Sequence, residues 1–135
     1  MEIREIMSSH VVTITPQQTL KEAAEVMRRI DSGFIPVGEN DQLVGTITDR
    51  DIVINGLAKG KSSDSKVGEV MSNEVLYCYQ NQEVAEVARN MGEQQVRRMP
   101  VVDQNKRLVG VVSLGDLSSD GDPSAAGVAL EQISE

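Results

Sequence analysis

Two stretches of the chain repeat one pattern of residues at a constant spacing of 64 positions. The matching pairs are Met7 and Met71, Leu20 and Val84, Ala24 and Ala88, Met27 and Met91, and Pro36 and Pro100. One inserted residue later, the run Leu43-Val44-Gly45 matches Leu108-Val109-Gly110. Related copies in a small protein tend to pack about a pseudo-twofold axis and to bind ligands in the clefts between them. The sequence therefore predicts two similar units rather than one unrepeated domain.

Composition and charge exclude some partners. The chain has 135 residues and a formal net charge of −8, so it repels a nucleic-acid backbone at long range. Aromatic residues make up only 2% of the chain, which leaves little for stacking on bases. We predict no nucleic-acid partner, and any site for an anion must be a local cluster of basic residues.

Cysteine and histidine are too scarce to form a metal site of the usual kind. His10 and Cys78 are the only residues of their types, so the sequence offers neither a His/Cys metal set nor an internal disulfide. The lack of a disulfide framework fits a reducing compartment. The N-terminus has no apolar signal core, and no run reaches about 18 apolar residues. We expect a cytoplasmic, soluble protein with no metal and no membrane partner.

Hydrophobic patterning predicts the order β-α-β-β-α in each copy, and hence an α+β fold. In the first copy, Thr19 and Glu22 form a capping-box pattern before an apolar stripe of helical spacing, and Gly33 is a plausible stop. The stripe consists of Leu20, Ala23, Ala24, Met27 and Ile30. The expected strands are 11–14, 34–37 and 43–47 in the first copy and 75–78, 99–102 and 108–112 in the second. The expected helices are 19–30, one from Thr48 with Ile52, Val53, Leu57 and Ala58 on its apolar side, 83–91, and one from Ser113.

These elements give expected domain boundaries. The first repeat is expected over 3–58 and the second over 67–118. A polar stretch without periodicity, 59–66, is expected to be a surface connector between them. Residues 119–135 are expected to form a loop and a short helix over 124–133.

A Ser/Thr-x-x-Asp pattern stands in both copies where a strand gives way to a helix. Thr48 precedes Asp51 by three residues, and Ser113 precedes Asp116 by the same spacing. Such a pattern is typical of a helix capping box. It also suits a carboxylate that accepts hydrogen bonds from the two vicinal hydroxyls of a ribose. The two roles are compatible, and the pattern alone does not choose between them.

The chain resembles a tandem pair of cystathionine β-synthase-type (CBS) domains, the unit called a Bateman module. The resemblance covers about residues 3–118. It is carried by Ile6-Met7-Ser8 and Val70-Met71-Ser72, by Phe34-Ile35-Pro36-Val37 and Arg98-Met99-Pro100-Val101, and by Leu43 to Ile52 and Leu108 to Leu117. It implies two repeats packed with pseudo-twofold symmetry into one compact module.

The resemblance implies regulatory binding of an adenosine-containing ligand, such as AMP, ADP, ATP or S-adenosylmethionine. In similar modules the acid of the Ser/Thr-x-x-Asp motif holds the ribose, which assigns that role here to Asp51 and Asp116, with Thr48 and Ser113 beside them. In similar modules, residues at the second strand of each repeat reach the phosphates. Those positions are Arg97 and Arg98 in the second copy, but Gly33 and Phe34 in the first, so the two clefts are expected to differ.

Other residues have weaker claims to the same sites. Arg50, next to Asp51, is a further candidate for a phosphate. Ser9, Gly33, Phe34 and Asn73 are candidates for contact with the base, although core packing also explains a lone Phe. Arg97 and Arg98 also fit a solvated surface. The second copy departs from the first at Tyr79-Gln80, which replaces Thr15-Pro16, and at Gly115, which replaces Arg50.

The sequence offers no catalytic set, because it has no His-paired nucleophile, no phosphate-binding P-loop pattern and no metal ligands. We therefore predict a regulatory adenine-nucleotide sensor without a cofactor, which acts in trans on an unknown effector protein. A homodimer is expected from the apolar helix faces that pack together in similar modules. A structural or protein-interaction module with empty clefts, or one that binds S-adenosylmethionine, are the alternatives.

Overall fold

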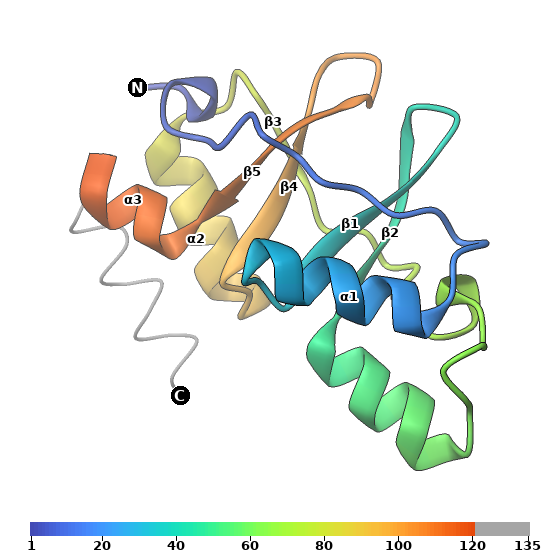
Figure 1. Ribbon diagram of the computed structural model, residues 1–135. Helices are drawn as coiled ribbons and strands as arrows, with labels where there is room; N and C mark the ends of the chain where they lie inside the picture. Colours follow the sequence, from blue (N-terminus) through green and yellow to red (C-terminus); the bar gives the residue numbers. More distant parts are fainter. Residues whose placement is uncertain (121–135) are drawn as a thin grey trace. The chain divides into compact units, whose positions relative to one another are not determined.

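The computed structural model describes the backbone of residues 1–120 and the side chains as far as Leu117. Contacts divide the chain into two compact units. The first-repeat unit is Val12–Val75, and the second-repeat unit combines Met1–Val11 with the chain from Leu76 onward. Each unit contains both helix and strand (Figure 1), which confirms the predicted α+β class.

The first-repeat unit consists of one α-helix, a hairpin and irregular helical turns. Helix α1 spans Leu20–Ile30. Strand β1 (Phe34–Glu39) pairs antiparallel with β2 (Gln42–Thr48). A π-helix over Asp51–Gly56 and a 3-10 turn over Leu57–Lys59 follow the hairpin. The helix therefore comes before the hairpin and a second helical segment comes after it.

The second-repeat unit has the same order of elements with a slightly larger sheet. Strand β3 (Cys78–Tyr79) precedes helix α2 (Val84–Gln94), and the hairpin β4 (Arg98–Val102) and β5 (Leu108–Ser113) follows. The sheet order is β3-β4-β5, with β3 parallel and β5 antiparallel to β4. Helix α3 (Leu114–Asp120) follows β5. The two repeats thus share their topology.

The leading segment of each repeat lies on the hairpin of the other repeat. Ser8, near the start of the first repeat, exchanges backbone hydrogen bonds of 2.9 and 3.0 Å with Val111 in β5. Ser72, near the start of the second repeat, makes the same pair of bonds with Thr46 in β2, at 2.9 and 3.1 Å. This exchange explains why the compact units begin at Val12 and Leu76 rather than at the start of each repeat.

Two glycines permit this close approach. A Cβ on Gly110 would lie 2.5 Å from Met7 Sδ and 2.8 Å from Ser8 O, and neither distance is compatible with a side chain. A Cβ on Gly45 would lie 2.9 Å from Met71 Sδ. The repeated Met-Ser and Leu-Val-Gly motifs are therefore the two sides of one contact, formed twice.

Helix α1 begins as the capping-box pattern predicts. Thr19 Oγ1 accepts from the N–H of Glu22 at 3.1 Å, and the Glu22 carboxylate accepts from the N–H of Thr19 at 3.2 Å. The N–H of Leu20 donates to the carbonyl of Ser65 at 2.9 Å. The helix ends at Ile30, because Asp31 adopts the left-handed conformation with φ of 53°. Gly33 is therefore not its stop.

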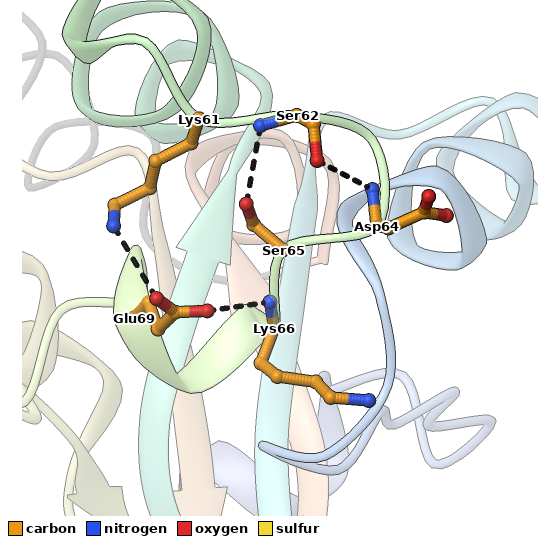
Figure 2. A network of polar contacts seen from close by, with 6 residues as sticks. All are labelled: Lys61, Ser62, Asp64, Ser65, Lys66 and Glu69. Carbon is orange, nitrogen blue, oxygen red and sulfur yellow. Dashed lines mark hydrogen bonds and ion pairs between the residues drawn. The ribbon is translucent and has the colours of Figure 1, made fainter.

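The residues of the connector bond to one another and to the turn that follows (Figure 2). Glu69 accepts from Lys61 Nζ at 3.4 Å and from the N–H of Lys66 at 2.9 Å. The hydrogen bond from the Lys66 backbone, with smaller contributions from Lys61, lowers the pKa of Glu69. Ser65 Oγ accepts from the N–H of Ser62 at 3.1 Å. These polar side chains close a turn, and the carbonyl of Ser65 accepts a hydrogen bond from the N–H of Leu20 at the start of α1.

Each unit has its own aliphatic core, as a chain poor in aromatic residues requires. The first core contains Ile14, Leu20, Ala23, Met27, Ile35, Val37, Ile47, Val67 and Val70. The second contains Ile3, Ile6, Cys78, Val84, Val87, Ala88, Met91, Met99, Val101, Val112 and Leu117. Cys78 is 1% exposed, and burial raises the pKa of its thiol to about 12. This cysteine is a core residue.

Both expected first strands are shorter than the sequence predicts. In the segment 11–14 only Ile14 pairs, through a parallel bridge to Val37. In the segment 75–78 the strand begins only at Cys78. The physical reason is that the chain passes between the units at residues 11–12 and 75–76, so the residues there do not belong to a sheet.

The helical predictions also need three corrections. The segment after β2 is a π-helix, in which Leu57 N–H reaches back to Ile52 O, and this wider turn leaves Val53 and Leu57 53% and 58% exposed. Ala24, expected on the apolar stripe of α1, is exposed, because the burial of α1 is confined to a narrower face. Helix α2 extends to Gln94. The helix predicted over 124–133 lies outside the described residues.

Candidate functional site

Strand pairing brings the two arginines of the second repeat next to the start of α3. Arg98 in β4 lies directly opposite Ser113, the last residue of β5. Opposite residues of an antiparallel pair have Cβ atoms about 5 Å apart. The carbonyl of Arg97 accepts from the N–H of Leu114 at 3.1 Å. Both arginine side chains are exposed, so they are available to a ligand.

The Ser-x-x-Asp motif of the second repeat forms a capping box at the start of α3. The N–H of Ser113 donates to Asp116 Oδ2 at 2.9 Å, and the N–H of Asp116 donates to Ser113 Oγ at 3.1 Å. Within residues 1–120, Asp116 Oδ1 receives no hydrogen bond. The structural role of the carboxylate thus uses one oxygen and leaves the other open. We call Arg97, Arg98, Ser113 and Asp116 the second-repeat site.

The first repeat builds the same backbone frame with other side chains. Phe34 in β1 lies opposite Thr48 in β2, and the carbonyl of Gly33 accepts from the N–H of Asp49 at 2.9 Å. The N–H of Thr48 donates to Asp51 Oδ2 at 2.9 Å, and the N–H of Asp51 donates to Thr48 Oγ1 at 3.1 Å. We call these five residues, together with Arg50, the first-repeat site.

Two further side chains distinguish the sites. The Asp49 carboxylate lies against Gly33, where a Cβ would be 2.4 Å from Asp49 Oδ2. Asn55 Nδ2 lies 3.4 Å from Asp51 Oδ1, so both oxygens of Asp51 have partners. In the first repeat an acid therefore occupies the place next to the glycine, and the motif carboxylate is already satisfied.

The formal charges of the two sites have opposite signs. The second-repeat site carries two arginines and one aspartate, for a sum of +1. The first-repeat site carries Arg50 with Asp49 and Asp51, for a sum of −1. In a chain of net charge −8, the second-repeat site is the more favourable place for an anion.

The two small polar candidates for the base, Ser9 and Asn73, each follow an isolated bridge to a hairpin. Ser9 is exposed and follows the bridge between Ser8 and Val111. Because this bridge is antiparallel, the chain beyond Ser8 runs toward Gly110 and away from Ser113. Asn73 is placed in the same way with respect to β2. Phe34 is half-buried, at the edge of the first-repeat site.

Sequence reasoning missed Asp49 and Asn55. Asn55 follows Asp51 by four residues, and this helical spacing is a signal that could have identified it. Asp49 had no such signal, because its contact with Gly33 comes from the register of β1 and β2. Both residues affect ligand choice. Asp49 adds a carboxylate to the first-repeat site, and Asn55 occupies the second carboxylate oxygen of Asp51.

The described residues contain neither a metal-binding cluster nor a membrane-spanning helix. Within residues 1–120, no three His, Cys, Asp or Glu side chains gather closely enough to hold a metal ion. None of the helices described there is both long and apolar enough to cross a membrane.

Comparison with known proteins gives the family. The CBS domain model matches twice, over residues 3–56 and 67–119. The CBS domain-containing protein YhcV of Bacillus subtilis is 41% identical over 133 residues, which cover 98% of this chain and 94% of YhcV. Hypoxic response protein 1 of Mycobacterium tuberculosis is 40% identical over 117 residues, which cover 85% of this chain and 81% of that protein.

Solved structures agree with this match. The Hypoxic Response Protein I structure, which has two coordinated zinc ions, gives a TM-score of 0.82 at 38% identity over 89% of this chain and 98% of that one. The CBS domain pair of MJ0100, in complex with 5′-methylthioadenosine and S-adenosyl-L-methionine, has a TM-score of 0.78. It is 28% identical, and the match covers 87% of this chain and 93% of that one. The cytosolic domain of the Mg²⁺ channel MgtE, in complex with ATP, gives 0.76 at 27% identity over 86% of this chain and 47% of that one. With two matches to one domain model and relatives of nearly the same length, this chain belongs to the CBS-domain family and is a CBS-domain pair.

Proposed function

We propose that this CBS pair is a non-catalytic regulatory module that binds an adenine nucleotide at the second-repeat site and signals in trans to a partner protein. The observation that carries the proposal is the position of Arg98 opposite Ser113, next to an aspartate with one open carboxylate oxygen. That arrangement supplies a cation for a phosphate and an acceptor for a ribose within one short stretch of backbone.

Asp116 is the proposed ribose ligand. Its Oδ2 is held by the N–H of Ser113, which fixes the orientation of the carboxylate before a ligand arrives. Its Oδ1 is then free to accept from a ribose hydroxyl, and hydrogen bonds to charged groups contribute about 1.5–3 kcal/mol each. A carboxylate positioned by the backbone also loses less conformational entropy on binding than a mobile one.

Arg97 and Arg98 are the proposed phosphate ligands. A guanidinium binds two phosphate oxygens with two N–H donors, which gives direction as well as charge. The two side chains lie on consecutive residues at the start of β4, and the carbonyl of Arg97 is fixed by Leu114. The first repeat has Gly33 and Phe34 at these positions, so we assign nucleotide binding to the second repeat.

Known relatives support the adenosine part of the proposal. The MJ0100 pair is seen with methylthioadenosine and S-adenosylmethionine, and the MgtE cytosolic domain with ATP. These ligands share an adenosine but differ in phosphate. An S-adenosylmethionine-type ligand is therefore the second candidate, and the arginine pair of this chain favours a phosphate over a sulfonium.

Thermal melting with a ligand panel tests this proposal. The panel consists of adenosine, AMP, ADP, ATP, methylthioadenosine and S-adenosylmethionine, with GMP as the control for the base. A ligand at about 100 times its dissociation constant stabilises the fold by about 2.7 kcal/mol. We expect the phosphorylated adenosines to raise the melting temperature more than adenosine does. If no adenosine compound raises it, the chain is the ligand-free interaction module instead.

We also propose that two copies associate. Val53, Ile54 and Leu57 are 53%, 45% and 58% exposed on the helical segment after β2, and such apolar side chains gain free energy when a partner covers them. Sedimentation velocity at micromolar concentration should show a dimer, and Leu57→Glu should convert it to a monomer. A monomeric wild-type protein would exclude this part of the proposal.

A further inference from the structure

A polar hollow of about 280 Å³ lies in the second-repeat unit, away from the second-repeat site. The residues of its lining that matter here are Arg4, Tyr79, Gln80, Asn81, Asp103 and Gln104. The hollow also includes Val102, which is at the end of β4 opposite Leu108, whereas Arg98 and Ser113 are at the other end of the same hairpin. Four residues of strand separate the two ends by about 13 Å. The hollow is therefore a separate place on the same unit.

The hollow gathers polar groups that have no partner in the described part of the chain. The side-chain amides of Gln80, Asn81 and Gln104 make no hydrogen bond within residues 1–120. Asp103 Oδ1 accepts from two backbone N–H groups, those of Asn105 at 2.8 Å and Arg107 at 3.0 Å. These bonds fix the carboxylate and leave Oδ2 open. Each amide offers both a donor and an acceptor to a ligand.

Tyr79 also belongs to the lining of the hollow. Tyr79 packs edge-to-face on Tyr77, with ring centroids 5.7 Å apart and an interplanar angle of 79°. Lys106 Nζ in turn lies 5.9 Å from the centre of the Tyr77 ring. These contacts orient the Tyr79 side chain.

The first repeat has the same backbone here but differs at three side chains, with Gly68, Thr15 and Pro16 in place of Arg4, Tyr79 and Gln80. The N–H of Arg4 donates to the carbonyl of Gln80 at 3.0 Å, and the N–H of Gly68 donates to the carbonyl of Pro16 at the same distance. A Cβ on Gly68 would lie only 3.2 Å from Pro16 Cβ and 3.3 Å from Pro16 O. A side chain at Gly68 would thus crowd Pro16, and the guanidinium and the tyrosine of the lining are particular to the second repeat.

We infer that this hollow binds a small, uncharged, polyhydroxylated molecule, about the size of a monosaccharide or a cyclic polyol. Planar amide, guanidinium and carboxylate groups can each bridge two neighbouring hydroxyls. The Arg4 guanidinium lies 2.7 Å from Glu2 Oε1 and is paired there, which leaves Asp103 as the unpaired charge of the described lining, so an anion is disfavoured and hydroxyl donors suit the open oxygen. The volume is at the lower limit of ligand pockets and suits about a dozen non-hydrogen atoms.

Titration of the full chain followed by NMR tests this inference. The probes are myo-inositol and D-glucose, and the readout is the side-chain NH₂ signals of Gln80, Asn81 and Gln104. We expect saturable shifts of these signals with a dissociation constant of about 1 mM, the range for a dozen atoms of ordinary ligand efficiency. Saturating AMP should leave the titration unchanged, so failure here is distinct from failure of the nucleotide site.

Exposed single variants provide the matched controls. Asn81→Ala and Gln104→Ala should each weaken binding about 5- to 10-fold with an unchanged melting temperature, because one hydrogen bond is lost. Gln17→Ala, at the position in the first repeat that corresponds to Asn81, should have no effect. The inference is overturned if neither probe saturates below 50 mM, if the alanine variants bind as well as the parent, or if L-glutamate or glycine betaine saturates these signals instead.

Discussion

In the first repeat, the turn into the helical segment after the hairpin carries Asp49, Arg50 and Asp51, whereas the second repeat has Leu114, Gly115 and Asp116 there. The backbone hydrogen bonds at these two places are alike: the capping distances are 2.9 and 3.1 Å in both. The side chains that differ set the formal charge of each site and decide whether the motif aspartate keeps an oxygen without a hydrogen bond. The fold is thus kept by the residues that the repeats share, and ligand choice depends on the residues in which they differ.

The largest expected contrast is between the two motif acids. Asp116→Ala should weaken nucleotide binding by about 2–4 kcal/mol, about 30- to 1000-fold, whereas Asp51→Ala should leave it unchanged. Both variants lose the bond from the N–H of the motif Thr or Ser, and Asp51→Ala also loses the contact with Asn55, so the unfolding free energy of each variant is measured beside its affinity. Isothermal titration with AMP measures it. Unchanged affinity in both variants would exclude the ribose role, and equal losses would mean that both repeats bind.

The next contrast concerns stability. Gly110→Ala should destabilise the second-repeat unit by about 1–3 kcal/mol, because the new methyl group overlaps Met7 Sδ and Ser8 O. Gly115→Ala is the matched control, since a Cβ there meets only Ser113 Oγ at 3.5 Å. In helix α3 that change should be neutral or stabilising. Urea denaturation gives both values, and equal effects of the two substitutions would contradict the close contact.

The phosphate role of the arginines predicts a ligand-dependent effect. Arg98→Ala should lower the affinity for AMP about tenfold, or about 1.5 kcal/mol, and leave the affinity for adenosine unchanged. If the affinities for AMP and for adenosine fell equally, Arg98 would support the structure of the site rather than bind a phosphate. Arg50→Ala, in the first repeat, is the control and should change neither value.

The helix starts of the two repeats should respond differently to alanine. Thr19 caps α1 through its side chain, whereas Glu83, at the start of α2, makes no side-chain cap bond. Thr19→Ala should therefore cost about 1 kcal/mol of unfolding free energy, and Glu83→Ala much less. Chemical denaturation of both variants measures the two costs. Similar losses would mean that the Met1 amino group, 3.0 Å from Glu83, contributes as much as a cap.

The last contrast appears only above neutral pH, at Cys78, which occupies the place that Ile14 has in the first core. The raised pKa means that the native thiol keeps its proton after an unfolded thiol, of ordinary pKa 9.0, has lost it. The native state then binds more protons than the unfolded state, so stability falls as the pH rises from about 9 toward 12. Cys78→Val should remove this part of the pH dependence. Rapid reaction of the native thiol with iodoacetamide at pH 8 would contradict its burial.

Local patterns in the sequence predicted local structure well. Thr19 and Glu22 located the start of α1, and both Ser/Thr-x-x-Asp spacings gave capping boxes, because these interactions depend only on residues three apart. Pairing between distant segments was not predictable in this way. The repeated Met-Ser motif was visible, but nothing in it says that Ser8 pairs with Val111 of the other repeat.

The candidate site shows the same limit. The proximity of Arg98 to Ser113 follows from the hairpin register, which the matched strands of the two copies made predictable. The contact of Asp49 with Gly33 and the change to a π-helix after Thr48 were missed, because they depend on side-chain packing and on local geometry that apolar periodicity does not encode.

The exchange of leading segments has a consequence for how the chain folds during synthesis. The first-repeat unit, Val12–Val75, is continuous, so all of it has left the ribosome before the second sheet is made. Met1–Val11 emerges before that unit, yet its partner strand β5 is translated only after it. The leading segment therefore waits, with Ile3 and Ile6 uncovered, until β5 is available to pair with it.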